Sequence, residues 1–433
     1  MASLALTLGI VLVVLLLLGF PMKVPLLGAA LLAVLLFEPF RYSSPEVLVQ
    51  QWITGIQPAA LIAVPMFMLA AEIMTRGQAA DRLLDVVTSF VGHRRGGLPI
   101  TAAVSCTLFG AISGSTQATV VAVGGPLRPR LVRAGYPDSF AMALIINASD
   151  IALLIPPSIG MIVYGVVSGT SIGELFLAGI GPGLLVLVLI CVYCHIASVR
   201  LGVPPLPRAS RSQRRQALKR ALLPAGFPVI VVGGIYSGVF SPTEAAAVSV
   251  LYAAVLEFIA FRKLRPRDLF AIARSTALVT AVVFVLVGAG QAFSWVVSYA
   301  ELPRLLVENV FGLNEGSSQL RVLLSIALAT FVGCMFVDPI VVILILTPIF
   351  APAAASAGID PVLVGTVVTM QVAIGSATPP FGCDIFTAIA IFRRPYWEVI
   401  RGTPPFLAIL LLSSLLVILV PEIALFLRDL AFR

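Results

Sequence analysis

The stretch that decides the fold of this protein is GLPITAAVSCTLFGAISGSTQATVVAVGGPL, residues 97–127. It contains no charged residue and is too long for one membrane crossing, which takes about 20 residues. Arginines flank it on both sides, at Arg94, Arg95, Arg128, Arg130 and Arg133. Because clustered arginines mark the cytoplasmic side of a membrane, the chain should enter and return on that same side. The stretch therefore predicts a re-entrant helical hairpin, broken between Gly110 and Thr116.

A second apolar stretch, residues 322–357, predicts another hairpin that enters from the opposite face. Its flanks are mostly acidic, with Glu308, Glu315 and Asp360 against Arg321 alone. Its middle is interrupted by Val337-Asp338-Pro339. Non-helical backbone at membrane depth is tolerated only where it is buried in protein or lines a watery cavity. We therefore expect each hairpin tip to form part of a site.

The composition agrees with a membrane protein. Of 433 residues, 59% are hydrophobic and 11% charged, whereas about a quarter of the residues in a soluble domain are charged. The net charge of +8 comes from arginines between apolar runs, so it indicates topology and not a nucleic-acid partner. The five cysteines lie in apolar stretches, which argues against disulfides. Cys191 to His195 spells a haem-attachment pattern, but the basic run that follows predicts the cytoplasmic side, where haem is not attached.

Ten further uncharged runs predict ten membrane crossings. They are residues 3–20, 24–37, 57–75, 139–168, 174–199, 222–239, 242–261, 277–297, 361–391 and 404–421. Three amphipathic stretches, 42–56, 78–92 and 393–402, are expected to lie along the membrane as arms of a scaffold.

An internal repeat relates the two halves of the chain. A shift of 223 residues places Pro156-Pro157 on Pro379-Pro380, and further pairs Gly110 with Gly333 and Pro129 with Pro352. Each half would then hold five crossings and one hairpin, so the second half should be inverted. The predicted organisation is a first repeat over 1–199, a cytoplasmic basic linker over 200–220, and a second repeat over 221–433. Both chain ends are then expected outside, although Arg428 and Arg433 argue mildly against that for the C-terminus. Inverted repeats with broken helices are the architecture of secondary transporters.

The two proline pairs predict cation sites beside the hairpin tips. Proline leaves backbone carbonyls without helical partners, and such carbonyls attract a small cation. The predicted Na⁺ site 1 consists of Ser113, Ser115, Pro156 and Pro157. The predicted Na⁺ site 2 consists of Asp338, Thr378, Pro379 and Gly382. The candidate substrate-binding residues are Ser113, Gly114, Ser115, Thr116, Asn147, Ser158 and Thr378.

Several motifs together resemble the large membrane subunit of TRAP transporters, the DctM family. They are Phe109 to Ser115, Leu154 to Ser158, Ser241 to Ala247, Val337-Asp338-Pro339 with Leu346-Thr347-Pro348, and Thr378 to Pro380. The resemblance covers essentially the whole chain. It implies an all-helical elevator-type fold with scaffold and transport domains in a bacterial inner membrane, and Na⁺-coupled import of organic acids without an organic cofactor. It also implies a small four-helix membrane subunit, expected to be a separate chain because no further helices precede Met1, and a periplasmic binding protein that delivers the substrate.

Other interpretations compete at particular residues and for the whole protein. Glu244 is expected to complete a capping box with Ser241. Asp384 is expected either to cap a helix over 385–392 or to line the site. Asp150 is expected to cap a helix, to pair with another side chain or to take part in transport. Gln371 is expected either to join helices or to line the cavity. A stand-alone Na⁺- or proton-coupled anion permease is the alternative transporter. An intramembrane hydrolase is disfavoured because the sequence has no HExxH, GxGD or GxSxG motif.

Overall fold

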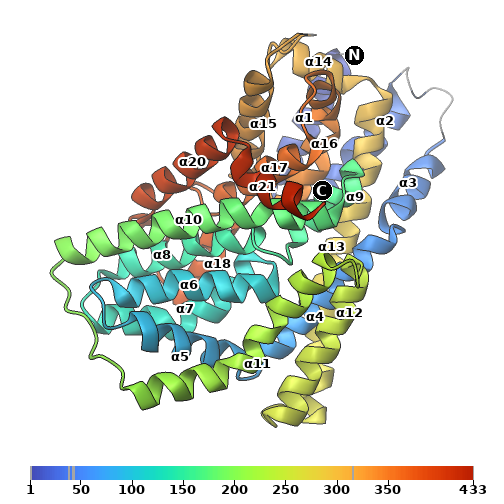
Figure 1. Cartoon of the computed structure of the whole chain (residues 1–433). Helices are drawn as coiled ribbons and strands as arrows, with labels where there is room; N and C mark the ends of the chain where they lie inside the picture. Colours follow the sequence, from blue (N-terminus) through green and yellow to red (C-terminus); the bar gives the residue numbers. More distant parts are fainter. Residues whose placement is uncertain (1, 38–39, 41–43, 315, 433) are drawn as a thin grey trace.

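The computed structural model describes all residues except 1, 38–39, 41–43, 315 and 433, and the described part is helical without a strand (Figure 1). Glu315, which the topology argument used, lies outside the described residues, as do Met1 and Arg433. The first half contains α1 (Ala2–Leu17), α2 (Lys23–Leu36), α3 (Glu46–Ile56), η2 (Ala59–Ile62), α4 (Ala63–Arg76), α5 (Ala79–Val91), α6 (Gly97–Ser113), α7 (Thr116–Arg133), α8 (Asp138–Ser149), η3 (Asp150–Leu153), α9 (Ile159–Ser168) and α10 (Ile172–Arg200).

The described part of the second half is also built from helices. It contains α11 (Arg211–Tyr236), α12 (Pro242–Ala254), the π-helical η4 (Val255–Ala260), α13 (Pro266–Tyr299), α14 (Leu302–Asn309), α15 (Gln319–Cys334), α16 (Pro339–Ser356), α17 (Pro361–Ser376), α18 (Cys383–Phe392), α19 (Tyr396–Ile400), α20 (Thr403–Leu419) and α21 (Glu422–Ala431). The capping box predicted at the start of α12 is confirmed, because the backbone N–H of Ser241 donates to Glu244 Oε2 and the N–H of Glu244 to Ser241 Oγ.

Long apolar helices with exposed apolar side chains make this a membrane protein. Six helices of the described chain are long and apolar enough to cross a membrane, or seven when the bent pair α20 and α21 counts as one. Phe270 and Leu278 on α13 and Val229 on α11 are 78%, 61% and 70% exposed. Soluble proteins rarely expose so much apolar surface to water, whereas apolar side chains on membrane-spanning helices contact lipid.

The structure interrupts two of the ten predicted spans at their proline pairs, as expected, and adds a helix after the last span. The predicted spans 139–168 and 361–391 are each divided, the first into α8, η3 and α9 and the second into α17 and α18. After the predicted span 404–421, a further helix, α21, follows α20 at a bend of 57°. Arg428 on α21 forms ion pairs with Asp360 at 2.7 Å, Asp429 at 2.7 Å and Glu174 at 3.6 Å. Its charge is therefore balanced locally, which weakens it as a signal of topology.

Both stretches predicted as hairpins fold as two helices joined by a short break. α6 ends at Ser113 and α7 begins at Thr116, while α15 ends at Cys334 and α16 begins at Pro339. The shift of 223 residues carries the bounds of α7 onto those of α16. It also carries Ser115, the N-cap residue of α7, onto Asp338, the N-cap residue of α16.

The helices form two groups in space (Figure 1). On the right of the view, α13 packs against α2, α3 and α4, and α12 packs against α4. On the left, α6, α7 and α8 pack together and α10 lies along α6 and α20. α16 contacts α13, and α6 contacts α4, so the hairpins lie against the right-hand group.

We predict that cysteines introduced at Ser210 and Lys263 are labelled only from the cytoplasm, and a cysteine at Glu308 only from outside. All three positions are exposed, so accessibility does not limit the reaction. The arginine-rich segments around Ser210 and Lys263 are expected to stay on the cytoplasmic side. Labelling of intact cells with a membrane-impermeant maleimide checks this, and the opposite pattern would exchange the sides from which the two hairpins enter.

Candidate functional site

The tips of both hairpins line one cavity of about 190 Å³. The first tip contributes Gly114, Ser115, Thr116 and Gln117, and the second contributes Asp338, Pro339 and Ile340. The remaining walls come from Leu153, Ile159 and Gly160 of the first break and from Met68, Val279, Val282, Val283 and Leu286 of α4 and α13. The cavity thus joins segments that lie more than 200 residues apart in the chain.

Three helices begin at this cavity. The first residues of α7, α9 and α16 are among its lining, at Thr116, Ile159 and Pro339. A helix N-terminus presents unpaired N–H groups and the positive end of the helix dipole. Three such ends around one small volume favour a negatively charged group inside it.

The first hairpin tip is held against the first proline break. The backbone N–H of Ile159 donates to the carbonyl oxygen of Gly114 at 3.2 Å. Gly114 has φ +60, and a Cβ there would lie 2.5 Å from the carbonyl oxygen of Pro157. Only glycine allows both this left-handed conformation and this approach. Ser115 then starts α7, because its Oγ accepts from the N–H of Ala118 at 3.4 Å.

The second tip is held against the second proline break in the same way. The backbone N–H of Phe381 donates to the carbonyl oxygen of Met335 at 3.1 Å. Asp338 Oδ1 accepts from the N–H of Ile340 at 2.9 Å and so caps α16. The peptide bonds Pro156-Pro157 and Pro379-Pro380 are both cis. Each predicted cation site therefore has its tip and its proline pair side by side.

Four of the predicted site residues lie behind the cavity surface and are at least 97% buried. Ser113 Oγ donates to the carbonyl oxygen of Ser115 at 3.3 Å, which stabilises the tip. Ser158 Oγ donates to the carbonyl oxygen of Leu153 at 2.6 Å, and Thr378 Oγ1 to that of Ile374 at 2.6 Å. Asn147 donates through Nδ2 to the carbonyl oxygen of Ala143 at 2.8 Å. None of the four is among the lining residues of this cavity, so their roles as substrate ligands stay predictions.

Gln371 has one of the two roles expected for it, because its side chain connects two helices. Gln371 Nε2 donates to Ser414 Oγ at 2.5 Å, which joins α17 to α20.

Among the described lining residues of the cavity, Asp338 is the one charged side chain, and no arginine or lysine is present. The electrostatics of the cavity therefore come from one carboxylate and three helix N-termini.

Asp384 has a role that sequence reasoning did not find. It does not cap α18, whose N-cap residue is Gly382 without a side-chain hydrogen bond. Instead, Thr116 Oγ1 donates to Asp384 Oδ1 at 2.8 Å and Ser376 Oγ donates to Asp384 Oδ2 at 2.6 Å. The carboxylate thus ties the start of α7 to the end of α17. An acidic residue just after a proline break was the available signal, but its partner Thr116 lies 268 residues away.

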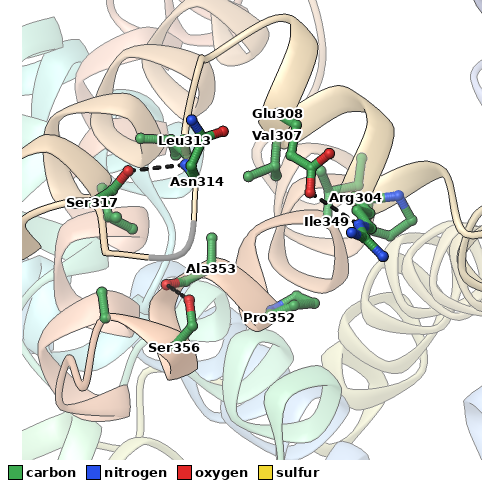
Figure 2. Close-up of a pocket in the computed structure, with 13 residues that line it drawn as sticks. Arg304, Val307, Glu308, Leu313, Asn314, Ser317, Ile349, Pro352, Ala353 and Ser356 are labelled. Atoms are coloured by element: carbon green, nitrogen blue, oxygen red, sulfur yellow. Dashed lines mark hydrogen bonds and ion pairs between the residues drawn. The ribbon is translucent and has the colours of Figure 1, made fainter.

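A second hollow, of about 240 Å³, lies between α14, the loop before α15 and the end of α16 (Figure 2). Arg304 and Glu308 form an ion pair at 2.9 Å on its rim, and the N–H of Asn314 donates to Ser317 Oγ at 3.0 Å. This hollow includes Ser356, the last residue of α16. Ser356 lies about 27 Å from the second hairpin tip, because a helix rises 1.5 Å per residue. No predicted site residue lines it.

The cysteines of the described chain are all free. His195, which ends the haem-like pattern, has its Nδ1 3.0 Å from the carbonyl oxygen of Arg95. No group of three or more His, Cys, Asp or Glu side chains in the described residues is placed to hold a metal ion.

Two hairpin tips and the first broken helix around one cavity, among long apolar helices, define a helical membrane transporter. The chain belongs to the family described as the tripartite ATP-independent periplasmic transporter, DctM component, whose model matches residues 9–423. Large subunits of this kind are permeases and not enzymes, and they work with a small membrane subunit and a periplasmic binding protein.

Known relatives agree with this assignment. The chain is 63% identical over 420 residues to the ectoine TRAP transporter large permease protein TeaC of Halomonas elongata, covering 97% of each chain. It is 62% identical to the ectoine/5-hydroxyectoine permease UehC of Ruegeria pomeroyi, covering 99% of each. It is 36% identical to the C4-dicarboxylate permease DctM of Pseudomonas aeruginosa, covering 91% of each. The crystal structure of the Alcanivorax borkumensis YdaH transporter has a similar fold, with a TM-score of 0.63 at 17% identity over 89% of each chain.

Ser115→Ala is expected to raise the Na⁺ concentration for half-maximal uptake about fivefold. In the predicted cation site the variant loses one neutral hydroxyl ligand, a contact worth about 1 kcal/mol, which corresponds to about fivefold in affinity. Ser115→Thr keeps the hydroxyl and is the control. Sodium titration of uptake checks this, and equal curves for alanine and wild type would remove Ser115 from the predicted cation site.

Proposed function

We propose that this protein imports ectoine or 5-hydroxyectoine together with Na⁺ across the bacterial inner membrane. A periplasmic binding protein delivers the substrate, and a small membrane subunit completes the complex. The observation that carries the proposal is the level of similarity. Identity to the two ectoine permeases is 62–63%, against 30–36% to relatives named for C4-dicarboxylates, sialic acid or 2,3-diketo-L-gulonate.

The charge of the cavity supports a zwitterion over a dianion. Ectoine carries one carboxylate and one cationic amidinium group, so its net charge is zero. A C4-dicarboxylate carries two carboxylates, for which arginine is the usual protein partner. The cavity lining has no arginine or lysine and has three helix N-termini, enough to attract one carboxylate. The earlier expectation of an organic acid is thereby narrowed to a carboxylate that carries its own positive charge.

Sodium coupling is supported by the two oxygen-rich tips. Hard cations prefer oxygen ligands, and freed carbonyls of broken helices coordinate coupling ions in transporters. Each tip is hydrogen-bonded to the break that follows it, through Ile159 to Gly114 and through Phe381 to Met335. These bonds hold the hydroxyl-bearing first tip beside the first break and the tip with the Asp338 carboxylate beside the second. We propose that Na⁺ site 1 includes Ser113, Ser115, Pro156 and Pro157, and that Na⁺ site 2 includes Asp338, Thr378, Pro379 and Gly382.

We further propose that the two helix groups of Figure 1 move relative to each other as scaffold and transport domains. The inverted repeat supports a moving unit built from both hairpins and both breaks, because both hairpin tips and the first break line one cavity. The apolar wall of α13, formed by Val279, Val282 and Leu286, is a surface along which such a unit could slide. It offers no hydrogen-bonding side chain that would hold the unit in one place.

The proposal is tested in liposomes that contain the large and small subunits, with the binding protein outside. We expect uptake of labelled ectoine to require an inward Na⁺ gradient and to be little affected by excess succinate. Equal uptake with potassium or choline in place of sodium would refute the coupling. Uptake that proceeds without the binding protein would favour the alternative, a stand-alone permease. Strong inhibition by succinate, together with no inhibition by hydroxyectoine, would refute the proposal that ectoines are the substrate.

A further inference from the structure

Asp150 is a buried carboxylate without a hydrogen-bond donor. It lies at the junction of α8 and η3, is 1% exposed, and neither of its side-chain oxygens has a partner. η3 packs against α6, α7 and α17, and Gly110 of α6 lies so close that a Cβ there would be 2.6 Å from the Cα of Ala152. The close packing leaves Asp150 inside the protein, and Asp150 is not among the lining residues of the cavity at the hairpin tips.

A third unpartnered oxygen lies one helical turn earlier. Asn147 is fully buried, and its Oδ1 has no donor. The orientation of this amide is fixed, because Nδ2 donates to the carbonyl oxygen of Ala143 and a flipped amide would place two acceptors together. Residues three apart in a helix share a face, so the Asn147 amide and the Asp150 carboxylate are neighbours. These two side chains thus carry three acceptor oxygens that receive no hydrogen bond.

The local charge is also uncompensated. Asp384, whose oxygens already accept from Thr116 and Ser376, is a second buried carboxylate, and it is bonded to α7 and α17, against which η3 packs. No arginine, lysine or histidine is among the buried residues of the described chain. An unpaired charge buried away from water is strongly unfavourable unless it is neutralised or coordinates a cation.

We propose that the oxygens of Asn147 and Asp150 bind a Na⁺ ion of their own, in addition to the two proposed at the hairpin tips. One carboxylate balances one monovalent charge, and an amide and a carboxylate are the hard oxygen ligands that such a cation takes. A divalent ion would leave one positive charge unbalanced beside this single unpaired carboxylate, and no group of three or more His, Cys, Asp or Glu side chains among the described residues is placed to hold one. The inference rests on the proposed sodium coupling and adds one ion to it.

The test compares wild type with Asp150→Asn in the reconstituted complex. Asparagine removes the charge, and its amide can donate to Asn147 Oδ1, so the fold is expected to persist. We expect the reversal potential of ectoine uptake to report one Na⁺ fewer per substrate molecule. The control is Glu244→Gln, which removes an exposed carboxylate but keeps the capping box, and it should match wild type.

Thermal unfolding of the purified protein gives a second readout that does not need transport. Na⁺ that binds the native state raises Tm, so Asp150→Asn should gain less Tm from added Na⁺ than wild type does. An unchanged Na⁺ count together with an unchanged Tm gain would overturn the inference. So would a variant altered only in its dependence on pH, because Asp150 would then carry a proton. Sodium-independent uptake by wild type would instead refute the proposed coupling itself.

Discussion

Asp338→Asn is expected to raise the Na⁺ concentration for half-maximal uptake at least about tenfold while the protein still folds. A charge-assisted contact to the ion is worth on the order of 1.5–3 kcal/mol, and 1.4 kcal/mol corresponds to a factor of ten. Asp338 is the one charged side chain lining the cavity, so no neighbouring carboxylate in that lining can replace it. Sodium titration of ectoine uptake measures the shift.

The helix cap at Asp338 allows structure and function to be separated. Its Oδ1 accepts from the N–H of Ile340, and asparagine can accept the same hydrogen bond. Asp338→Asn therefore removes the charge and keeps the cap, whereas Asp338→Ala removes both. A residue that only capped α16 would give a normal Asn variant and an Ala variant destabilised by about 1 kcal/mol. That result would exclude Asp338 from the cation site.

Gly114→Ala is expected to abolish uptake. A non-glycine residue in the left-handed conformation costs roughly 1–2 kcal/mol, and the added Cβ would lie 2.5 Å from the carbonyl oxygen of Pro157. Because that carbonyl oxygen belongs to the backbone and cannot turn aside as a side chain can, the tip must move away from the first break. The hydrogen bond from Ile159 to Gly114 would then be lost, and with it the arrangement of the predicted Na⁺ site 1.

Gly125→Ala is the matched control, since it lies in the same hairpin and a Cβ there would have no atom within 4 Å. Uptake rates of the two variants, measured at equal amounts of reconstituted protein, check the prediction. Normal uptake by Gly114→Ala would mean that the first tip does not need its close contact with Pro157. Loss of uptake in both variants would mean that the hairpin tolerates no change at all, and the special role of Gly114 would be refuted.

Much of the architecture could be read from the chain because it depends on local chemistry. Long uncharged runs require lipid, and the glycine and proline breaks stop helices wherever they occur. The predicted break between Gly110 and Thr116 falls at Gly114, and the one at Val337 to Pro339 falls before α16. The Ser241 and Glu244 capping box follows from a spacing of three residues. Each of these features involves residues within one or two helical turns.

The site itself depends on contacts that no local pattern contains. The bond between Thr116 and Asp384 joins residues 268 apart, and the meeting of both tips at one cavity requires the two halves to pack together. The α13 wall was not predicted because Val279 and Leu286 look like any lipid-facing residues in a long apolar helix. The sequence alone determined a membrane protein with two interrupted hairpins and two proline breaks. Only the tertiary structure decided which carboxylates gained donors and which, like Asp150, did not, because hydrogen-bond partners in a buried core are set by packing between distant segments.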